Sequence, residues 1–112
     1  MVDFLNEYLK NGEFEDNSWN GLQVEGREEV NKVAFCVTAG VDPFKKAKDE
    51  EADMIVAHHG LFWKEADPSI RGWMKKRVAF LLENDISFYA SHLPLDAHPE
   101  DGNNARLMTL LD

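Results

Sequence analysis

Two polar stretches that directly follow apolar runs constrain this chain more than any other feature. AHHG at residues 57–60 closes the apolar run 54–57, and SHLPLD at residues 91–96 follows the apolar run 86–90. Short apolar runs bounded by polar residues are typical of inner strands in an α/β sheet. Ligands bind such sheets outside the carboxyl ends of the strands. We therefore expect four side chains to gather at one edge of the sheet: His58, His59, His92 and Asp96.

The order of the predicted elements indicates an α/β fold with a mostly parallel sheet. Helical spacing of apolar residues predicts helices over 2–11, over 43–51, between 67–69 and 84, and from 103 onwards. Strands are predicted over 32–38, from 53 and over 86–90, with a short extended piece at 22–24 after a turn. This succession predicts parallel strands joined by right-handed crossovers. Asp42 and Asp67 are expected as helix caps, and the last helix is expected to turn Leu107, Met108 and Leu111 inward.

Length and charge limit the class of protein. The 112 residues predict a single α/β domain, and the net charge of −9 argues against nucleic acid or an anionic membrane surface as the main partner. The one cysteine, Cys36, lies in an apolar run and is expected to be a buried core residue. The N-terminus carries acids where a signal peptide needs basic residues. We expect a cytoplasmic protein without a membrane span.

The four rim side chains suit a metal site. Imidazole and carboxylate together favour Zn, Fe, Mn, Co or Ni. Neighbouring strand residues point to opposite faces, so His58 and His59 can share a site only past the strand end, where Gly60 permits a turn. Asp96 is then a candidate bridge between two ions. A histidine pair on an ordinary loop is the alternative.

His92 has two interpretations. It is a candidate proton carrier, or a side chain that holds a ligand in place, and the alternative is a histidine bonded to the backbone. His98 is expected at the surface. Phe62 and Trp63 are expected to pack in the core or an interface, and the alternative is a wall against a planar substrate. No strained nucleophile turn or glycine-rich phosphate loop occurs in the sequence.

Four motifs then stand in an informative order: NGLQVEG at 20–26, AHHGLFW at 57–63, HLPLDAHP at 92–99 and GNN at 102–104. Their order and spacing resemble the Nif-three-like dinuclear metal-binding family, many of whose members are named GTP cyclohydrolase I type 2. The resemblance implies a three-layer α/β/α fold of two related halves, assembled into hexamers. It also implies a centre of two divalent transition-metal ions, with His58, His59 and Asp96 as ligands.

The resemblance further implies a His and a Glu from the C-terminal half of a longer chain. The last helix reaches Asp112 without a capping glycine, so we expect the N-terminal half of a longer protein. The alternative is that another copy completes the site. The implied function is a metal-dependent hydrolase that activates a bridging water on a small-molecule substrate. His92 is our own candidate for its proton carrier, from the position of that residue. The alternative is a non-catalytic metal-binding or regulatory interaction module.

Overall fold

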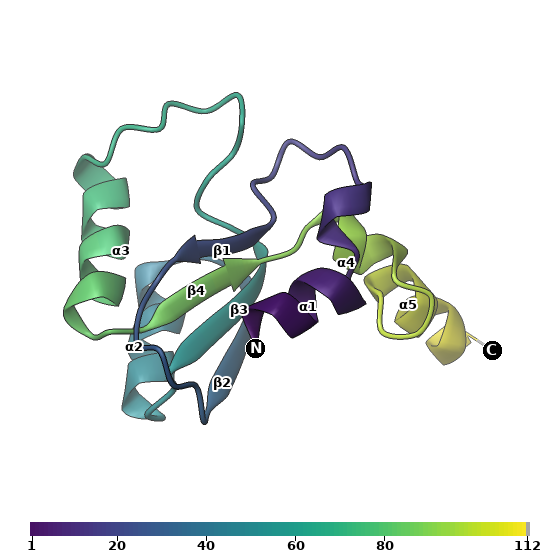
Figure 1. The fold of residues 1–112 in the computed structure, drawn as a ribbon, viewed down its shortest axis with the longest axis horizontal. Helices are drawn as coiled ribbons and strands as arrows, with labels where there is room; N and C mark the ends of the chain where they lie inside the picture. Colours follow the sequence, from purple (N-terminus) through teal and green to yellow (C-terminus); the bar gives the residue numbers. More distant parts are fainter. Residues whose placement is uncertain (112) are drawn as a thin grey trace.

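The computed structural model describes residues 1–111, and a four-stranded sheet lies at its centre (Figure 1). Its strands are β1 (Gly21–Val24), β2 (Val33–Thr38), β3 (Met54–His59) and β4 (Ser87–Ala90), in the order β1-β4-β3-β2. β2, β3 and β4 are parallel, whereas β1 runs antiparallel to β4. The predicted mostly parallel sheet is confirmed. The carboxyl ends of its three parallel strands therefore meet at one edge.

Helices flank both faces of the sheet. α2 (Val41–Asp49) and α3 (Gly72–Glu83) pack on one face, and α1 (Val2–Tyr8) lies on the other (Figure 1). The 3₁₀ helix η1 (Asn11–Glu13) follows α1. Two more helices, α4 (Leu93–Ala97) and α5 (Asn103–Leu111), follow β4 beyond the end of the sheet (Figure 1). The architecture is the expected α/β/α arrangement.

The alternation of side chains along the strands builds two apolar cores. Ile55 and Phe88 face α2 and α3, where Phe44 is fully buried with its ring centroid 5.4 Å from that of Phe88. On the other face, Met54 and Tyr89 pack with residues of α1. Successive strand residues point to opposite faces, so a strand that feeds both cores must be apolar at every position. This requirement explains the apolar runs of β3 and β4.

The helix boundaries differ from the sequence prediction at several points. α1 ends at Tyr8 instead of residue 11, because Lys10 adopts a left-handed conformation with φ 55°. α2 has Gly40 as its N-cap, so Asp42 lies in the first turn, where the helix dipole still favours a negative charge. α3 begins at Gly72 instead of residues 67–69, and Asp67 accepts the Ser69 N–H at 2.9 Å within the preceding turn. Both predicted helix caps are therefore wrong.

Several apolar side chains predicted to face inward are exposed. Leu107, Met108 and Leu111 of α5 are 55%, 59% and 72% exposed, so the periodicity identified a helix without the surface that would cover it. Asp112, the predicted end of that helix, lies outside the described residues. Cys36 is only half-buried, because β2 is an edge strand with α2 on one side. Burial raises the pKa of its thiol.

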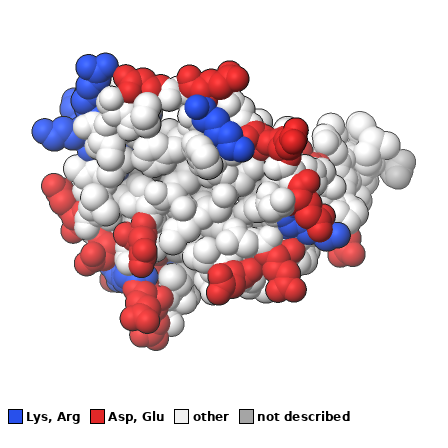
Figure 2. All heavy atoms as spheres, turned by 45° about the horizontal axis from the view of Figure 1, so that its top comes forward, with Lys and Arg blue, Asp and Glu red and all other residues white. Residues whose placement is uncertain are grey.

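Acidic side chains are spread over the surface. Figure 2 shows them distributed around one face, with the less numerous basic side chains in small separate groups. This distribution agrees with the net charge of −9. The face in Figure 2 shows no continuous stripe of basic side chains of the kind that binds a nucleic-acid backbone. Among residues 1–111, no helix has both the length and the apolar character that crossing a bilayer demands.

Candidate metal centre

The carboxyl end of β3 brings two adjacent histidines together. Both belong to the strand, contrary to the expectation that it ends before them. The ladder between β3 and β4 stops at the Ala57–Ala90 pair, one residue before His58, whereas β2 still pairs Thr38 with His59. The last two residues of β3 therefore lie beyond its ladder with β4. The rings of His58 and His59 lie close together there, with their centroids 4.6 Å apart.

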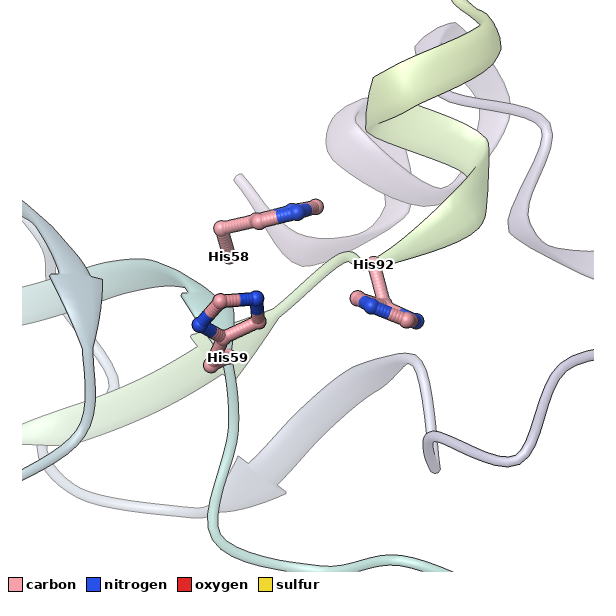
Figure 3. A group of neighbouring side chains, drawn as sticks. All are labelled: His58, His59 and His92. Carbon is pink, nitrogen blue, oxygen red and sulfur yellow. The ribbon is translucent and has the colours of Figure 1, made fainter. Parts of the chain in front are cut away.

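His92 completes a cluster of three imidazoles. It precedes α4 and follows the end of β4, the neighbour of β3 in the sheet. Its ring centroid lies 5.0 Å from that of His58 and 5.6 Å from that of His59, and Figure 3 shows the three rings side by side. One ring nitrogen from each histidine lies within 4.8 Å of the other two. The predicted convergence of the two stretches at one edge is therefore present for these histidines.

Each imidazole is held through its Nδ1 atom. The Nδ1 of His58 lies 3.0 Å from the Ser91 carbonyl oxygen, and that of His92 lies 3.1 Å from Asp16 Oδ1. The Nδ1 of His59 lies 3.0 Å from the Thr38 hydroxyl. A carbonyl or an ionised carboxylate only accepts a hydrogen bond, so His58 and His92 carry their proton on Nδ1. Their Nε2 lone pairs are thereby left to bind an ion.

Asp16 is the main residue that sequence reasoning missed. Its side chain is 3% exposed and contacts His92. Burial alone would raise the pKa of Asp16, but hydrogen bonds from Asn20, the Leu93 N–H, His92 and the Ser18 N–H hold that pKa well below its usual range. The local sequence around Asp16 gives no sign of this role, because its partner lies 76 residues away.

Asp96 lies beside the histidine cluster. Its Oδ1 is 3.4 Å from Nε2 of His58 and accepts a hydrogen bond from Asn103 Nδ2 at 2.8 Å. α4, which sequence reasoning did not predict, carries this carboxylate. Two ligand atoms on one tetrahedral zinc ion lie about 3.3–3.5 Å apart, given Zn–N and Zn–O bonds of about 2.0–2.2 Å. The separation of His58 and Asp96 is thus compatible with a shared ion.

The NGLQVEG stretch supports the end of β3. The side-chain oxygen of Gln23 accepts the Leu61 N–H at 2.7 Å, and a Cβ on Gly60 would lie 2.6 Å from the Gln23 amide. Close packing therefore requires glycine at position 60, instead of the turn expected from the sequence. Asn20 accepts the His92 N–H at 2.9 Å. This motif thus holds both stretches of the centre.

Aromatic residues border the centre on one side. Trp63 packs edge-on against His92 at 5.1 Å, and with Phe62 and Trp19 it lines a cavity of about 360 Å³. Both Phe62 and Trp63 are partly buried. His98 lies outside the cluster, partly buried, with its ring centroid 4.5 Å from that of Tyr8 and the two rings tilted by 33°. Of the four histidines, three thus face one site and the fourth does not.

The electrostatics of the cluster favour the neutral form of His59. Burial lowers the pKa of His59, and the neighbouring His58 and His92 lower it further, against the opposing effect of Asp96. Metal ions bind the neutral ring, so a lowered pKa favours the form that binds. Three convergent imidazoles, a nearby carboxylate and fixed Nδ1 protons fit a divalent transition metal. The three histidines could therefore bind a metal ion.

Comparisons with known proteins find a family and several relatives to which the chain is similar. The family model described as Duf34/NIF3 (NGG1p interacting factor 3) matches residues 1–112. A protein of Archaeoglobus fulgidus named GTP cyclohydrolase 1 type 2 homolog is 53% identical over 108 residues, which are 96% of this chain and 44% of that protein. A protein of the same name from Pyrococcus horikoshii is 51% identical over 112 residues, which are 100% of this chain and 44% of that protein.

Solved structures agree with these sequence relationships. Protein ybgI, described as a structural genomics target of unknown function, is 48% identical with a TM-score of 0.94 over 98% of this chain and 44% of its own. TTHA1606 from Thermus thermophilus is 49% identical with a TM-score of 0.93, over 98% of this chain and 46% of its own. The chain therefore spans less than half the length of each of these relatives.

Proposed function

The chain belongs to the Duf34/NIF3 family, and we propose that it supplies part of a metal-dependent hydrolytic centre. The observation that supports this proposal is the cluster of His58, His59 and His92, in which each Nδ1 is held by a partner. Bound divalent ions, with Fe, Zn, Mn, Co and Ni as candidates, would lower the pKa of a bridging water to near neutrality and polarise the substrate.

His58, His59 and Asp96 are the proposed ligands. His58 directs Nε2 towards Asp96, at 3.4 Å from its carboxylate, and the Ser91 carbonyl fixes the His58 tautomer. His59 is held by Thr38 on the neighbouring strand. Asp96 adds a second oxygen on the same side chain, so one carboxylate is able to contact two ions.

His92 is the proposed proton carrier. Its Nδ1–H donates to the Asp16 carboxylate, so its Nε2 is the atom that accepts a proton from a reacting group. Trp63 packs edge-on against the ring and borders the neighbouring cavity. His92 itself lines a separate open hollow of about 770 Å³ with Asp16 and Lys64, and a small-molecule substrate there would lie next to the imidazole. The names of the curated relatives suggest attack on a purine ring as the first reaction to test.

The proposed centre needs donors from outside the chain. Even one catalytic zinc ion usually takes three protein ligands, so three ligand residues leave two ions under-coordinated. The chain covers 44% of its curated relatives, which supports a contribution from the remainder of a longer protein. A further copy in a homo-oligomer, of hexameric form by the resemblance, is the other proposed source.

The test is metal content together with turnover. Elemental mass spectrometry of protein purified without tag or chelator should find transition metal in the wild type and little in His58→Ala/His59→Ala. His98→Ala is the matched control, because His98 lies outside the cluster, and it should retain the wild-type metal content. Equal metal content in all three proteins would contradict the assigned site.

Turnover separates the hydrolase from a non-catalytic metal protein. GTP and other purine nucleotides are incubated with the metal-loaded wild type and with Asp96→Asn, and products are followed by chromatography. Hydrolysis that Asp96→Asn abolishes would support the enzyme. Bound metal without turnover of any of these compounds, by this chain or by the full-length protein, would favour the metal-binding module.

A further inference from the structure

One buried carboxylate joins the loop before β1 to the start of α4. Asp16 Oδ1 accepts the Ser18 N–H and the His92 Nδ1–H, each at 3.1 Å. Its Oδ2 accepts Asn20 Nδ2 at 3.0 Å and the Leu93 N–H at 2.8 Å. Four donors therefore converge on a side chain that is 3% exposed. A carboxylate satisfied in this way stays ionised and has a fixed orientation.

The same loop also forms a hydrogen bond with the His92 backbone. The side-chain oxygen of Asn20 accepts the His92 N–H at 2.9 Å, while Asn20 itself donates to Asp16. The imidazole of His92 is thus held at Nδ1. The main chain of His92 is held at its nitrogen, one bond before the Cα. The His92 side chain is 24% exposed and lies beside the rings of His58, His59 and Trp63. Its Nδ1 is the ring atom that Asp16 contacts.

We propose that Asp16 is a positioning residue, which fixes the Nδ1–H tautomer of His92 and directs its Nε2 into the centre. This inference rests on the proposed function for its purpose, because a held imidazole matters most where its Nε2 carries a proton or binds an ion. The hydrogen bond itself involves only the side chains of Asp16 and His92.

Asp53 offers a matched control. Its carboxylate also accepts two backbone N–H groups, from Asn31 at 2.8 Å and Lys32 at 3.0 Å, and it pairs with Arg27 at 2.9 Å. Its side chain is 11% exposed, and it precedes β3 at the end opposite the histidines. Replacing Asp53 therefore removes a comparably bonded carboxylate without touching His92.

The experiment records long-range ¹H–¹⁵N correlation spectra of the imidazole rings in metal-free protein. The pH is set well above the ordinary histidine pKa of about 6.5, so that the rings are neutral. His92→Gln assigns the His92 signals. The wild type should show the Nδ1–H tautomer at His92. Asp16→Ala should shift His92 to the tautomer mixture of an unrestrained imidazole, and Asp53→Ala should keep the wild-type pattern.

Two results would overturn the inference: an Nε2–H tautomer at His92 in the wild type, or an unchanged Nδ1–H tautomer in Asp16→Ala. If Asp16→Ala does not fold, the wild-type spectrum decides alone. The spectra need no metal, so they test Asp16 even where the wild-type chain proves to bind none and the proposed function fails.

Discussion

A Cβ added to Gly60 would lie 2.6 Å from the side-chain amide of Gln23, closer than non-bonded atoms approach one another. Gln23 cannot move away freely, because its oxygen holds the Leu61 N–H and its nitrogen donates to the Trp19 carbonyl. The residue after the two histidines is therefore fixed by a side chain of β1. This contact connects the packing of the sheet to the geometry of the centre.

Gly60→Ala should destabilise the chain by about 1–3 kcal/mol, the usual range for an overpacked interior. The added methyl group would also lie 2.7 Å from Cβ of Ala90, so relief of one contact worsens the other. Urea unfolding followed by circular dichroism measures the change. Gly12→Ala is the control, because a Cβ there meets nothing within 4 Å. Equal stabilities for the two variants would disprove the packing argument.

Thr38→Val should weaken metal binding with little change in fold. The Thr38 hydroxyl lies 3.0 Å from His59 Nδ1, and valine keeps the shape of the side chain without the hydroxyl. Loss of such a supporting hydrogen bond lowers metal affinity about 10–100-fold. Competition with a chromophoric chelator measures the affinity for Zn²⁺. Thr109→Val on α5, which removes a hydroxyl bonded to the Ala105 carbonyl, should bind as the wild type does.

Asp53→Asn should reduce stability near neutral pH and lose that effect in acid. Hydrogen bonds from the Asn31 and Lys32 N–H groups lower the pKa of Asp53, against burial, and Arg27 lowers it further. A lowered folded-state pKa means that Asp53 stabilises the fold above the ordinary aspartate pKa of about 3.9. This contribution disappears as the pH falls through the folded-state pKa. Thermal unfolding of both proteins from neutral pH downwards should show converging Tm values; a constant difference would contradict the assignment.

Tyr89→Phe should destabilise the chain by about 1–3 kcal/mol, because it leaves two partly buried amide side chains without their hydrogen-bond partner. The Tyr89 hydroxyl donates to Asn6 at 2.9 Å and accepts from Asn11 at 2.5 Å. Burial raises the pKa of Tyr89 to about 12. Since the unfolded chain ionises near pH 10, the wild type should lose stability between about pH 10 and 12. Tyr89→Phe should lack this part of the loss, as alkaline unfolding curves would reveal.

The sequence predicted those strands and site residues that local residue patterns determine. Apolar runs located β2, β3 and β4, and the polar residues that follow two of these runs identified His58, His59 and His92 as neighbours. Asp16 could not be found in this way, because its importance lies in a partner that is distant in sequence. The apolar periodicity over residues 103–111 correctly predicted a helix, α5. Periodicity does not say which surface covers the apolar side chains of a helix. Asp42 and Asp67 fitted capping statistics, whereas the actual helix starts depended on the turns before them.

The strand order β1-β4-β3-β2 has a kinetic consequence. β4 is the last of the four strands in sequence and yet lies between β1 and β3, so β1 has no partner in this sheet until residues 87–90 are available. The loop that carries Asp16 and Asn20 likewise waits for His92. Contacts between such distant segments form slowly, because closing a long loop is entropically unfavourable. On a ribosome, the first strand would thus remain unpaired until nearly the whole of this chain had emerged, and the histidine cluster would be among the last features to form.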